Sequence, residues 1–294
     1  MESLKKDKVS KLSHKKCNPG VGLRSTHFPY LERSPDTCIK WFEAVSENYM
    51  DSFGRPRLIL NKIRERYPIA LHGVSMNLLS THGLNELYLQ NLKSLIDDIE
   101  PFIVSDHLCW TGTKPSNIHD LLPFPYTEES LKIVCQNIDH AQNILGRSLA
   151  IENVSTYMTF KQSEFTEWDF LVEVSKRTDV KLLLDINNIY VSSANHGFDP
   201  IKYINAIPTE IVCQVHLAGY TDMGDFLFDT HSKPVYPKVW ELFRLFIEKA
   251  PNVPFMMEWD EDIPEFKVVE NEVLKAIDIW REVHIQGDTK YVQK

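Results

Sequence analysis

Long apolar runs, paired cysteines and an excess of basic residues are all missing from this sequence of 294 residues. No run approaches the ~20 apolar residues of a membrane-spanning helix, so we expect no membrane segment. The N-terminus lacks the apolar core of a signal peptide, and the five cysteines are scattered without a CxxC pair. Both absences favour a cytoplasmic protein with reduced thiols. The formal net charge of −9 disfavours nucleic acid as a partner, because phosphate binding favours a basic face.

Two terminal segments differ in composition from the rest of the chain. Residues 1–19 contain six lysines and few apolar residues, which predicts a polar, basic and disordered tail. Residues 286–294 are predicted to form a second tail. The segment between them, residues 20–285, has close to the length of one (β/α)8 barrel, which is about 250 residues. Because 43% of the chain is apolar, this segment can bury a sizeable core.

Short apolar runs recur along this central segment, and each leads to a polar residue that could bind a metal or a substrate. Seven of the runs read AVSENY, IALHG, FIVSDHL, LAIEN, KLLLDINN, CQVHLAG and FMMEWD. The polar residues at or near their ends are Glu47, His72, His107, Glu152, Asp185, His216 and Glu258. An eighth run, GVGLR, comes just before His27. The runs are continuous rather than alternating, as expected for parallel strands that are buried on both faces.

The spacing of these residues predicts the fold class. From His72 to Glu258 the successive intervals are 31 to 45 residues, which fits one strand, one helix and two loops. Between the runs, Asn85 to Asp98 has apolar residues on one helical face, and Thr127 is a plausible N-cap for the helix that Gly146 ends. A doubly wound sheet would share the alternation, but there is no GxGxxG turn. We therefore predict a single TIM-like (β/α)8 barrel, with a metal cluster at the carboxyl-end mouth of its strands.

The types of residue at the strand ends indicate metal binding. A single histidine after a strand is more often a hydrogen-bonded core residue than a ligand, but His72, His107 and His216 repeat that context. A buried carboxylate must be paired, hydrogen-bonded or metal-bound, and few basic residues lie at strand ends to pair with Glu152 or Glu258. The same reasoning applies to Asp185, which ends another strand. The triplet DTH in the loop after the seventh strand adds Asp229 and His231 as weaker candidates. Asn188 is a further candidate, which could instead cap the next turn.

The set of donors restricts the metal. Imidazole and carboxylate ligands without a cysteine suit iron, manganese or zinc better than an all-thiolate zinc site or an oxygen-only magnesium site. More than six candidate ligands exceed the needs of one ion, so we expect a cluster of two or three. Composition does not distinguish iron from zinc or manganese.

Motifs along this sequence resemble those of a known family. Ten segments occur in family order between Gly20 and Ile279: GVGLRSTHFPYLE, SENY, LHGVSMNL, SDHLCW, DLLPFPYTEESL, IENVSTY, LLLDINNIYVSSANHGFDP, VHLAGY, DTHSKPV and EWDEDIP. They are similar to the multinuclear non-haem iron-dependent oxidative enzymes, which include the iron subunit of methanobactin biosynthesis and the peptide-modifying enzyme of the thiaglutamate pathway.

The resemblance implies both a reaction and a set of site residues. It implies two or three irons in a mixed Fe(II)/Fe(III) state, dioxygen as co-substrate, and oxidation of a cysteine in a ribosomally made precursor peptide. It also implies a companion protein that binds the leader of that peptide. The implied metal ligands are His72, His107, Glu152, Asp185, Asn188, His216, Asp229, His231 and Glu258. Within this set His72, Glu152, Asp185 and His216 are the expected catalytic residues, and His27, Asn153 and Glu47 are expected around the ligands.

Two other readings of the same barrel are open. A zinc or manganese hydrolase or sugar isomerase, of the endonuclease IV or xylose isomerase type, would also collect histidines and carboxylates at its strand ends. A nuclease would need a basic rim for phosphates, which the acidic composition disfavours. A non-enzymatic binding protein with a vestigial site is the third reading, and the nearly complete ligand set argues against it.

Overall fold

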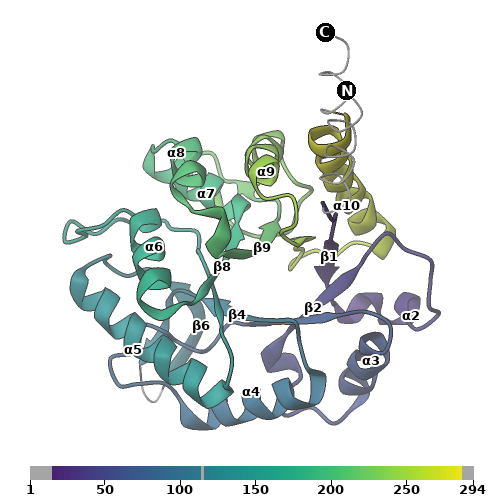
Figure 1. The fold of residues 1–294 in the computed structure, drawn as a ribbon, viewed down its shortest axis with the longest axis horizontal. Coiled ribbons are helices and arrows are strands. Elements are labelled where there is room, and N and C mark those ends of the chain that lie inside the picture. The colour runs from purple at the N-terminus through teal and green to yellow at the C-terminus, as the bar shows by residue number, and fades with distance from the viewer. Residues whose placement is uncertain (1–14, 114–115, 287–294) are drawn as a thin grey trace, which may run out of the picture.

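The computed structural model describes residues 15–113 and 116–286, and its strands form a closed barrel (Figure 1). Eight parallel strands follow one another in the order β1-β12-β9-β8-β7-β4-β3-β2. They are β1 (Pro19–Gly22), β2 (Trp41–Val45), β3 (Ile69–Gly73), β4 (Ile103–His107), β7 (Ala150–Glu152), β8 (Lys181–Asp185), β9 (Val212–Leu217) and β12 (Phe255–Met257). The predicted (β/α)8 fold is therefore confirmed.

Helices surround the strands on the outside of the barrel (Figure 1). They are α2 (Phe28–Leu31), α3 (Arg55–Arg64), α4 (Glu86–Ile99), α5 (Glu128–Leu145), α6 (Glu167–Thr178), α7 (Ile186–His196), α8 (Pro200–Ala206), α9 (Pro237–Lys249) and α10 (Phe266–Arg281). The predicted cap Thr127 is confirmed for α5. The helix predicted from Asn85 is α4, and the Asn85 side chain caps it by accepting from the backbone N–H groups of Leu87 and Tyr88. Gly146 ends α5 at φ +68°, a conformation that glycine adopts without strain.

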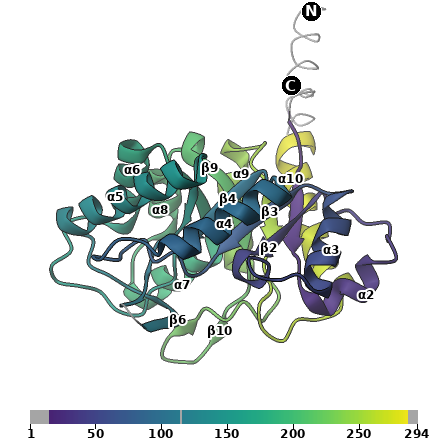
Figure 2. The same cartoon turned by 90° about the horizontal axis from the view of Figure 1, so that it is seen from below.

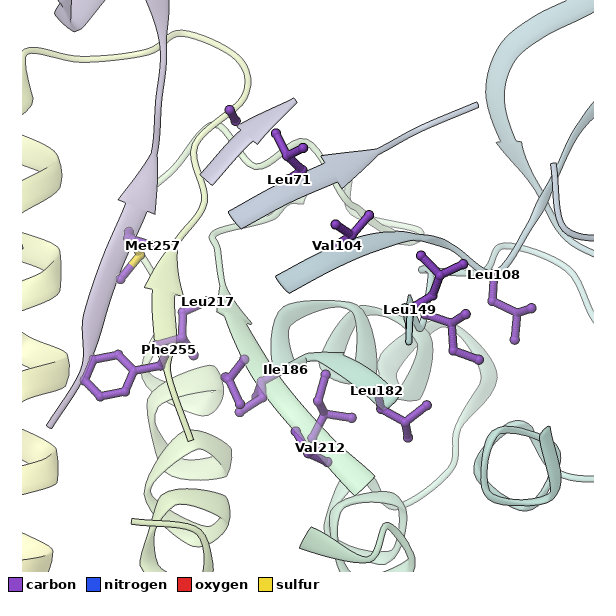
Figure 3. Close-up of a cluster of buried hydrophobic side chains, with 14 of the residues drawn as sticks. Leu71, Val104, Leu108, Leu149, Leu182, Ile186, Val212, Leu217, Phe255 and Met257 are labelled. Carbon is purple, nitrogen blue, oxygen red and sulfur yellow. The ribbon is translucent and has the colours of Figure 1, made fainter. Parts of the chain in front are cut away.

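Alternation along each strand separates the apolar core from the polar interior. Leu71 and Val104 belong to the buried cluster that Figure 3 shows, whereas their neighbours His72 and Ser105 are hydrogen-bonded to each other. Since successive side chains of a strand point to opposite faces, the apolar set packs against the helices and the polar set points into the barrel.

An apolar floor closes the barrel below the polar residues. Trp41, Ala70 and Met256 form a separate buried cluster, with Ile103 packed against it. Each of them lies two residues before a polar side chain in or directly after the same strand, so they occupy the interior one layer deeper. Gly20 leaves the space that the Trp41 ring occupies, because a Cβ at this position would overlap the ring.

Two hairpins project from the barrel and were not predicted from the sequence. One pairs β5 (Trp110–Thr113) with β6 (Ser116–Leu122), and the other pairs β10 (Thr221–Asp222) with β11 (Leu227–Phe228). They follow the carboxyl ends of β4 and β9, and Figure 2 shows β6 and β10 along one edge of the molecule. Both hairpins therefore border the barrel mouth.

The terminal segments lie largely outside the described part of the chain. The predicted tails comprise residues 1–19 and 286–294, and residues 1–14 and 287–294 are not described. Pro19 already belongs to β1, and Gln286 ends a π-helical turn that starts at Glu282. Across the described residues, none of the helices combines the length and apolarity that crossing a membrane would require.

Candidate metal centre

The first group of candidate ligands is formed by His72, His107 and Glu152, at the ends of the neighbouring strands β3, β4 and β7. Both histidines face one carboxylate oxygen: Nε2 of His72 lies 3.0 Å and Nε2 of His107 3.4 Å from Oε2 of Glu152. All three side chains are buried. Parallel strands in register thus bring three ligand atoms to one point.

Hydrogen bonds fix the state of the His107 ring. Its Nδ1 lies 3.0 Å from the carbonyl oxygen of Gly73, which can only accept, so Nδ1 carries the proton. Nε2 then presents a lone pair to Glu152, and neither carboxylate oxygen of Glu152 has a hydrogen-bond partner. A lone pair and a buried carboxylate repel each other unless a cation lies between them. A metal ion at this point would remove the repulsion.

The second group combines Glu152 with Asp185, His216 and Glu258. Nδ1 of His216 lies 2.9 Å from Oε2 of Glu258 and 3.6 Å from Oε1 of Glu152. Its other ring nitrogen, Nε2, lies 3.1 Å from Oε1 of Glu43, a buried carboxylate in the middle of β2. Glu43 can accept the Nε2 proton and leave Nδ1 free to bind a metal, the arrangement of a carboxylate–histidine–metal triad.

The third group lies nearer the opening and consists of His231, Glu258 and Asp260. Nδ1 of His231 is 3.1 Å from Oε2 of Glu258 and 3.3 Å from Oδ2 of Asp260. His231 has a φ of +46°, a strained conformation for a residue with a side chain and one that often marks functional sites. Arg24 lies behind this group, paired with Asp260 and 3.7 Å from Oε1 of Glu258.

Shared carboxylates join the three groups into one chain of sites. Glu152 belongs to the first and second groups, and Glu258 to the second and third. Because a carboxylate has two oxygens, each of these side chains could offer one ligand atom to each of its two groups. The structure therefore offers three overlapping groups of candidate ligands, and the expected number of ions stays a prediction.

Asp229 and Asn188, the other two predicted ligands, line the same mouth. Oδ1 of Asp229 lies 2.7 Å from Nε2 of His231 and accepts a hydrogen bond from the Asn187 amide. The Asn188 amide donates to the carbonyl oxygen of Asn153, and its own Oδ1 is buried without a hydrogen-bond partner. An amide oxygen in this state could serve as a metal ligand, and the cap of α7 is Asp185 rather than Asn188.

The three residues expected around the ligands occupy different places. Asn153 exchanges two hydrogen bonds of 2.9 Å with the backbone of Asp185 and so orients this strand end. Glu47 lies in a short 3-10 turn after β2 and accepts from the Tyr88 hydroxyl. His27 lies in the turn after β1, where its Nε2 donates to the carbonyl oxygen of Pro264. The recorded hydrogen bonds therefore link Asn153, but not Glu47 or His27, to a predicted ligand.

The buried carboxyl and imidazole groups of the centre have shifted pKa values. Burial opposes ionisation of Glu152, yet the charges of the surrounding histidines lower the pKa of this carboxyl below its usual value. Burial likewise opposes protonation of His72, but Glu152 raises the pKa of this imidazole to about 9. For Asp185, burial raises the pKa of the carboxyl well above its usual value. Metal ions would supply the same positive charge without protons, so the donor set fits a metal cluster.

Three residues that contact the centre were missed in the sequence. Glu43 lies within the strand WFEAV, Gln214 contacts both Glu43 and His216, and Asp260 follows Glu258 by two residues. The available signals were an acidic residue inside an apolar strand, a polar residue two positions before His216, and a second acid in EWDED.

The centre opens into a cavity of about 450 Å³ at the barrel mouth. Its walls include His72 and His107 from the strand ends, Leu121 from β6, and Asp229 from the loop after β11. Among the described lining residues, Arg24 is the one lysine or arginine. A cavity of this volume, open at the mouth, can admit a side chain of a larger substrate to the ligands.

A family model for the RiPP precursor modification enzymes MbnB/TglH/ChrH matches residues 18–281. The chain belongs to this family. RiPPs are ribosomally synthesised and post-translationally modified peptides, so family membership places the chain among enzymes that act on peptide precursors. The resemblance that the ten sequence segments indicated is confirmed.

Similar proteins agree with this assignment and with the fold. A UPF0276 protein of Rhizorhabdus wittichii is 47% identical over 88% of this chain and 94% of its own length. One from Caulobacter vibrioides is 46% identical over 89% of this chain and 92% of its own length.

Solved structures of other barrels share the architecture. L-ribulose 3-epimerase superposes with a TM-score of 0.63 at 11% identity, covering 95% of this chain and 99% of its own. Endonuclease IV from Thermus thermophilus superposes with a TM-score of 0.58 at 15% identity, covering 90% and 99%. At such low identity these likenesses show the barrel fold alone.

Proposed function

We propose that this protein is an iron- and dioxygen-dependent oxidase that modifies a cysteine of a ribosomally made precursor peptide. The observation that carries the proposal is the chain of three ligand groups, joined by Glu152 and Glu258, beneath an open cavity. Its imidazole, carboxylate and amide donors suit iron, and no cysteine belongs to any of the groups found among the described residues. Bound iron would supply redox chemistry with dioxygen and a Lewis acid that binds the thiolate of the substrate.

The residues of the chain then have separate tasks. His72 and His107 hold one end of the cluster, each with its second ring nitrogen engaged by Ser105 or by the Gly73 carbonyl. Glu43 orients His216 in the same way from below. Glu152 and Asp185, buried at the centre, provide the negative charge that retains the ions. His72, Glu152, Asp185 and His216 are accordingly the proposed catalytic residues.

The surface around the mouth favours a peptide substrate. Tyr157, Phe226 and Phe228 form an exposed aromatic cluster with ring centroids 5.5 to 6.2 Å apart. The Tyr157 hydroxyl accepts a hydrogen bond from the backbone N–H of Asp229, which ties this cluster to the metal centre. Exposed aromatic side chains beside a deep site are typical of surfaces that bind polypeptides. A companion protein that binds the leader segment is part of the same proposal.

Elemental analysis with Mössbauer spectroscopy tests the proposal, on protein purified anaerobically from iron-supplemented cells. Two or three irons per chain, with antiferromagnetically coupled ferric and ferrous signals, are expected. Stoichiometric zinc or manganese, with apo-protein unable to assemble iron, would instead support the hydrolase or isomerase reading.

Substitutions of the ligands extend this test. We expect His72→Ala and Glu152→Ala to remove bound iron and activity together, because each takes a ligand from a buried group. Glu129→Ala, at an exposed position in the first turn of α5, is the control and should retain both. Normal turnover with full iron content in either ligand variant would contradict the assignment.

A further inference from the structure

A second cavity, of about 210 Å³, lies in the barrel wall formed by α6, α7 and the loops after β6 and β7. Aromatic rings make up much of its lining, among them Phe124, Tyr126, Phe165, Trp168 and Phe198. Ligand sites for whole small molecules usually measure about 300 to 1,000 Å³. This cavity is smaller, and its size suits one long side chain rather than a free cofactor.

One carboxylate, Glu167, lines this aromatic cavity. It is the first residue of α6, but the cap of that helix is Thr166, whose hydroxyl accepts from the Asp169 N–H. In the part of the chain that the structure describes, Glu167 makes no ion pair, and the Tyr203 hydroxyl is its polar neighbour. Burial raises the pKa of the Glu167 carboxyl to about 8, which shows how poorly its charge is compensated.

We infer that this cavity binds the cationic side chain of a lysine or arginine in the peptide substrate. Aromatic faces attract a cation, and an incoming ammonium or guanidinium group favours the ionised form of Glu167, which then supplies the opposite charge at the wall. The aliphatic stem of lysine or arginine would pack against the rings while its charged end reaches the carboxylate. The net charge of −9 on the chain also favours a basic peptide over an acidic one. This inference rests on the proposed function.

Two loops connect the aromatic cavity to the metal cavity. Leu121 lines the metal cavity, and Pro123, two residues later, lines the aromatic one. Thr156 lines the aromatic cavity, and its neighbour Tyr157 is hydrogen-bonded to Asp229 at the metal cavity. A peptide with its cysteine at the metals could therefore place a basic residue in the aromatic cavity a few positions away along its chain, at up to about 3.3 to 3.6 Å per residue.

His196 lines this cavity with its Nε2 hydrogen-bonded to Thr156, and Lys202 is the one lysine or arginine that the described contacts bring to this region. Its Nζ lies 5.6 Å from the centroid of the Trp168 ring, and the residue is exposed. No ion pair joins it to Glu167 among the described residues. Lys202 thus contacts one ring of the cavity without neutralising Glu167.

Binding of two small probes to the full-length protein tests the inference. Nα-acetyl-lysine N-methylamide and Nα-acetyl-norleucine N-methylamide differ in the ammonium group, and calorimetric titration measures each dissociation constant. We expect the lysine probe to bind at least about 10-fold more tightly than the norleucine probe, the loss expected when a buried charge is left without its partner. Equal binding of both probes, or no binding of either, would overturn the inference.

Variants assign the binding to Glu167. Glu167→Gln keeps the shape of the side chain and should abolish the preference for lysine, whereas Glu129→Gln, at an exposed site on α5, should retain it. Unchanged preference in Glu167→Gln would place the lysine elsewhere and contradict the assignment. The probe comparison on the unaltered chain does not depend on any variant folding.

The two proposals can fail separately. Probe binding does not require the cluster, and iron content is measured without a probe. Loss of lysine selectivity with normal iron would reject the cavity assignment alone, whereas zinc in place of iron would reject the oxidase alone.

Discussion

Glu43 shows how a single buried side chain can control a metal ligand that it does not replace. Its carboxylate contacts Nε2 of His216 from within β2, while Nδ1 of the same ring faces Glu258 and Glu152. Both Glu43 and His216 are almost fully buried, so water cannot take over this hydrogen bond. Glu43 and the Gln214 amide, which lies 2.8 Å from the same ring nitrogen, therefore set the tautomer and the angle of the ring together.

Substitution Glu43→Gln should weaken metal binding without abolishing the fold. An amide in this position can still hydrogen-bond the ring, but it lacks the charge that strengthens the ligand. We expect about 10- to 100-fold weaker metal affinity, the usual cost of losing such a supporting carboxylate. Competition with a chelator of known affinity measures this change.

A matched comparison separates this role from general destabilisation. Glu47→Gln alters a carboxylate that follows the strand in which Glu43 lies. The hydrogen-bond donors to Glu47 are the backbone N–H of Val74 and the Tyr88 hydroxyl. The metal affinity of this variant should stay closer to that of the unaltered protein than the affinity of Glu43→Gln does. Equal weakening in both variants would contradict the specific role of Glu43.

At the scale of elements, the strands were predictable because their pattern is local. Parallel strands buried on both faces are continuous apolar runs. The residue after each run lies at the carboxyl-end mouth of the barrel. The sequence alone therefore predicts that His72, His107 and Glu152 lie at one mouth. The helix starts at Asn85 and Thr127 were equally local, since a cap depends on the next three residues.

The parts that could not be predicted depend on closure of the barrel and on loop paths. Glu43 lies mid-strand, and its approach to His216 depends on the pairing of β2, β9 and the strands between them. Asp260 reaches His231 because the backbone N–H of Asp260, shortly after β12, donates to the carbonyl oxygen of His231. The β5–β6 and β10–β11 hairpins pair over short spans. Their sequences have little of the apolar alternation that predicts a strand.

Helix α4 offers a test of the N-terminal cap that the structure shows. Removing the Asn85 cap by Asn85→Ala should lower the free energy of unfolding by about 1 kcal/mol, because two N–H groups of the first turn lose their acceptor. Urea denaturation measures the change. Gln90→Ala, on the exposed side of the same helix, is the control and should cost less. Equal losses would argue against capping as the cause, and metal content should not change in either variant.

Over the whole molecule, the metal centre concentrates charge inside a barrel that is otherwise closed by apolar side chains. The floor of Trp41, Ala70 and Met256 keeps water out from below, and the carboxylates collect above it. Such a group of buried acids is costly to fold unless protons or metal ions compensate it. Stability of the fold and occupancy of the centre should therefore be coupled.

Removal of the metal should destabilise the entire protein. Ligands that bind only the folded state raise its stability, by about 4 kcal/mol when present at 1,000 times their dissociation constant. We expect dialysis against a chelator to lower the melting temperature measured by calorimetry, and anaerobic return of ferrous iron to restore it. The same treatment of Glu152→Gln should produce a smaller decrease, since that variant lacks the carboxylate common to two of the ligand groups. An unchanged melting temperature after complete metal removal would mean that protons alone balance the buried acids, and that the barrel folds independently of its cluster.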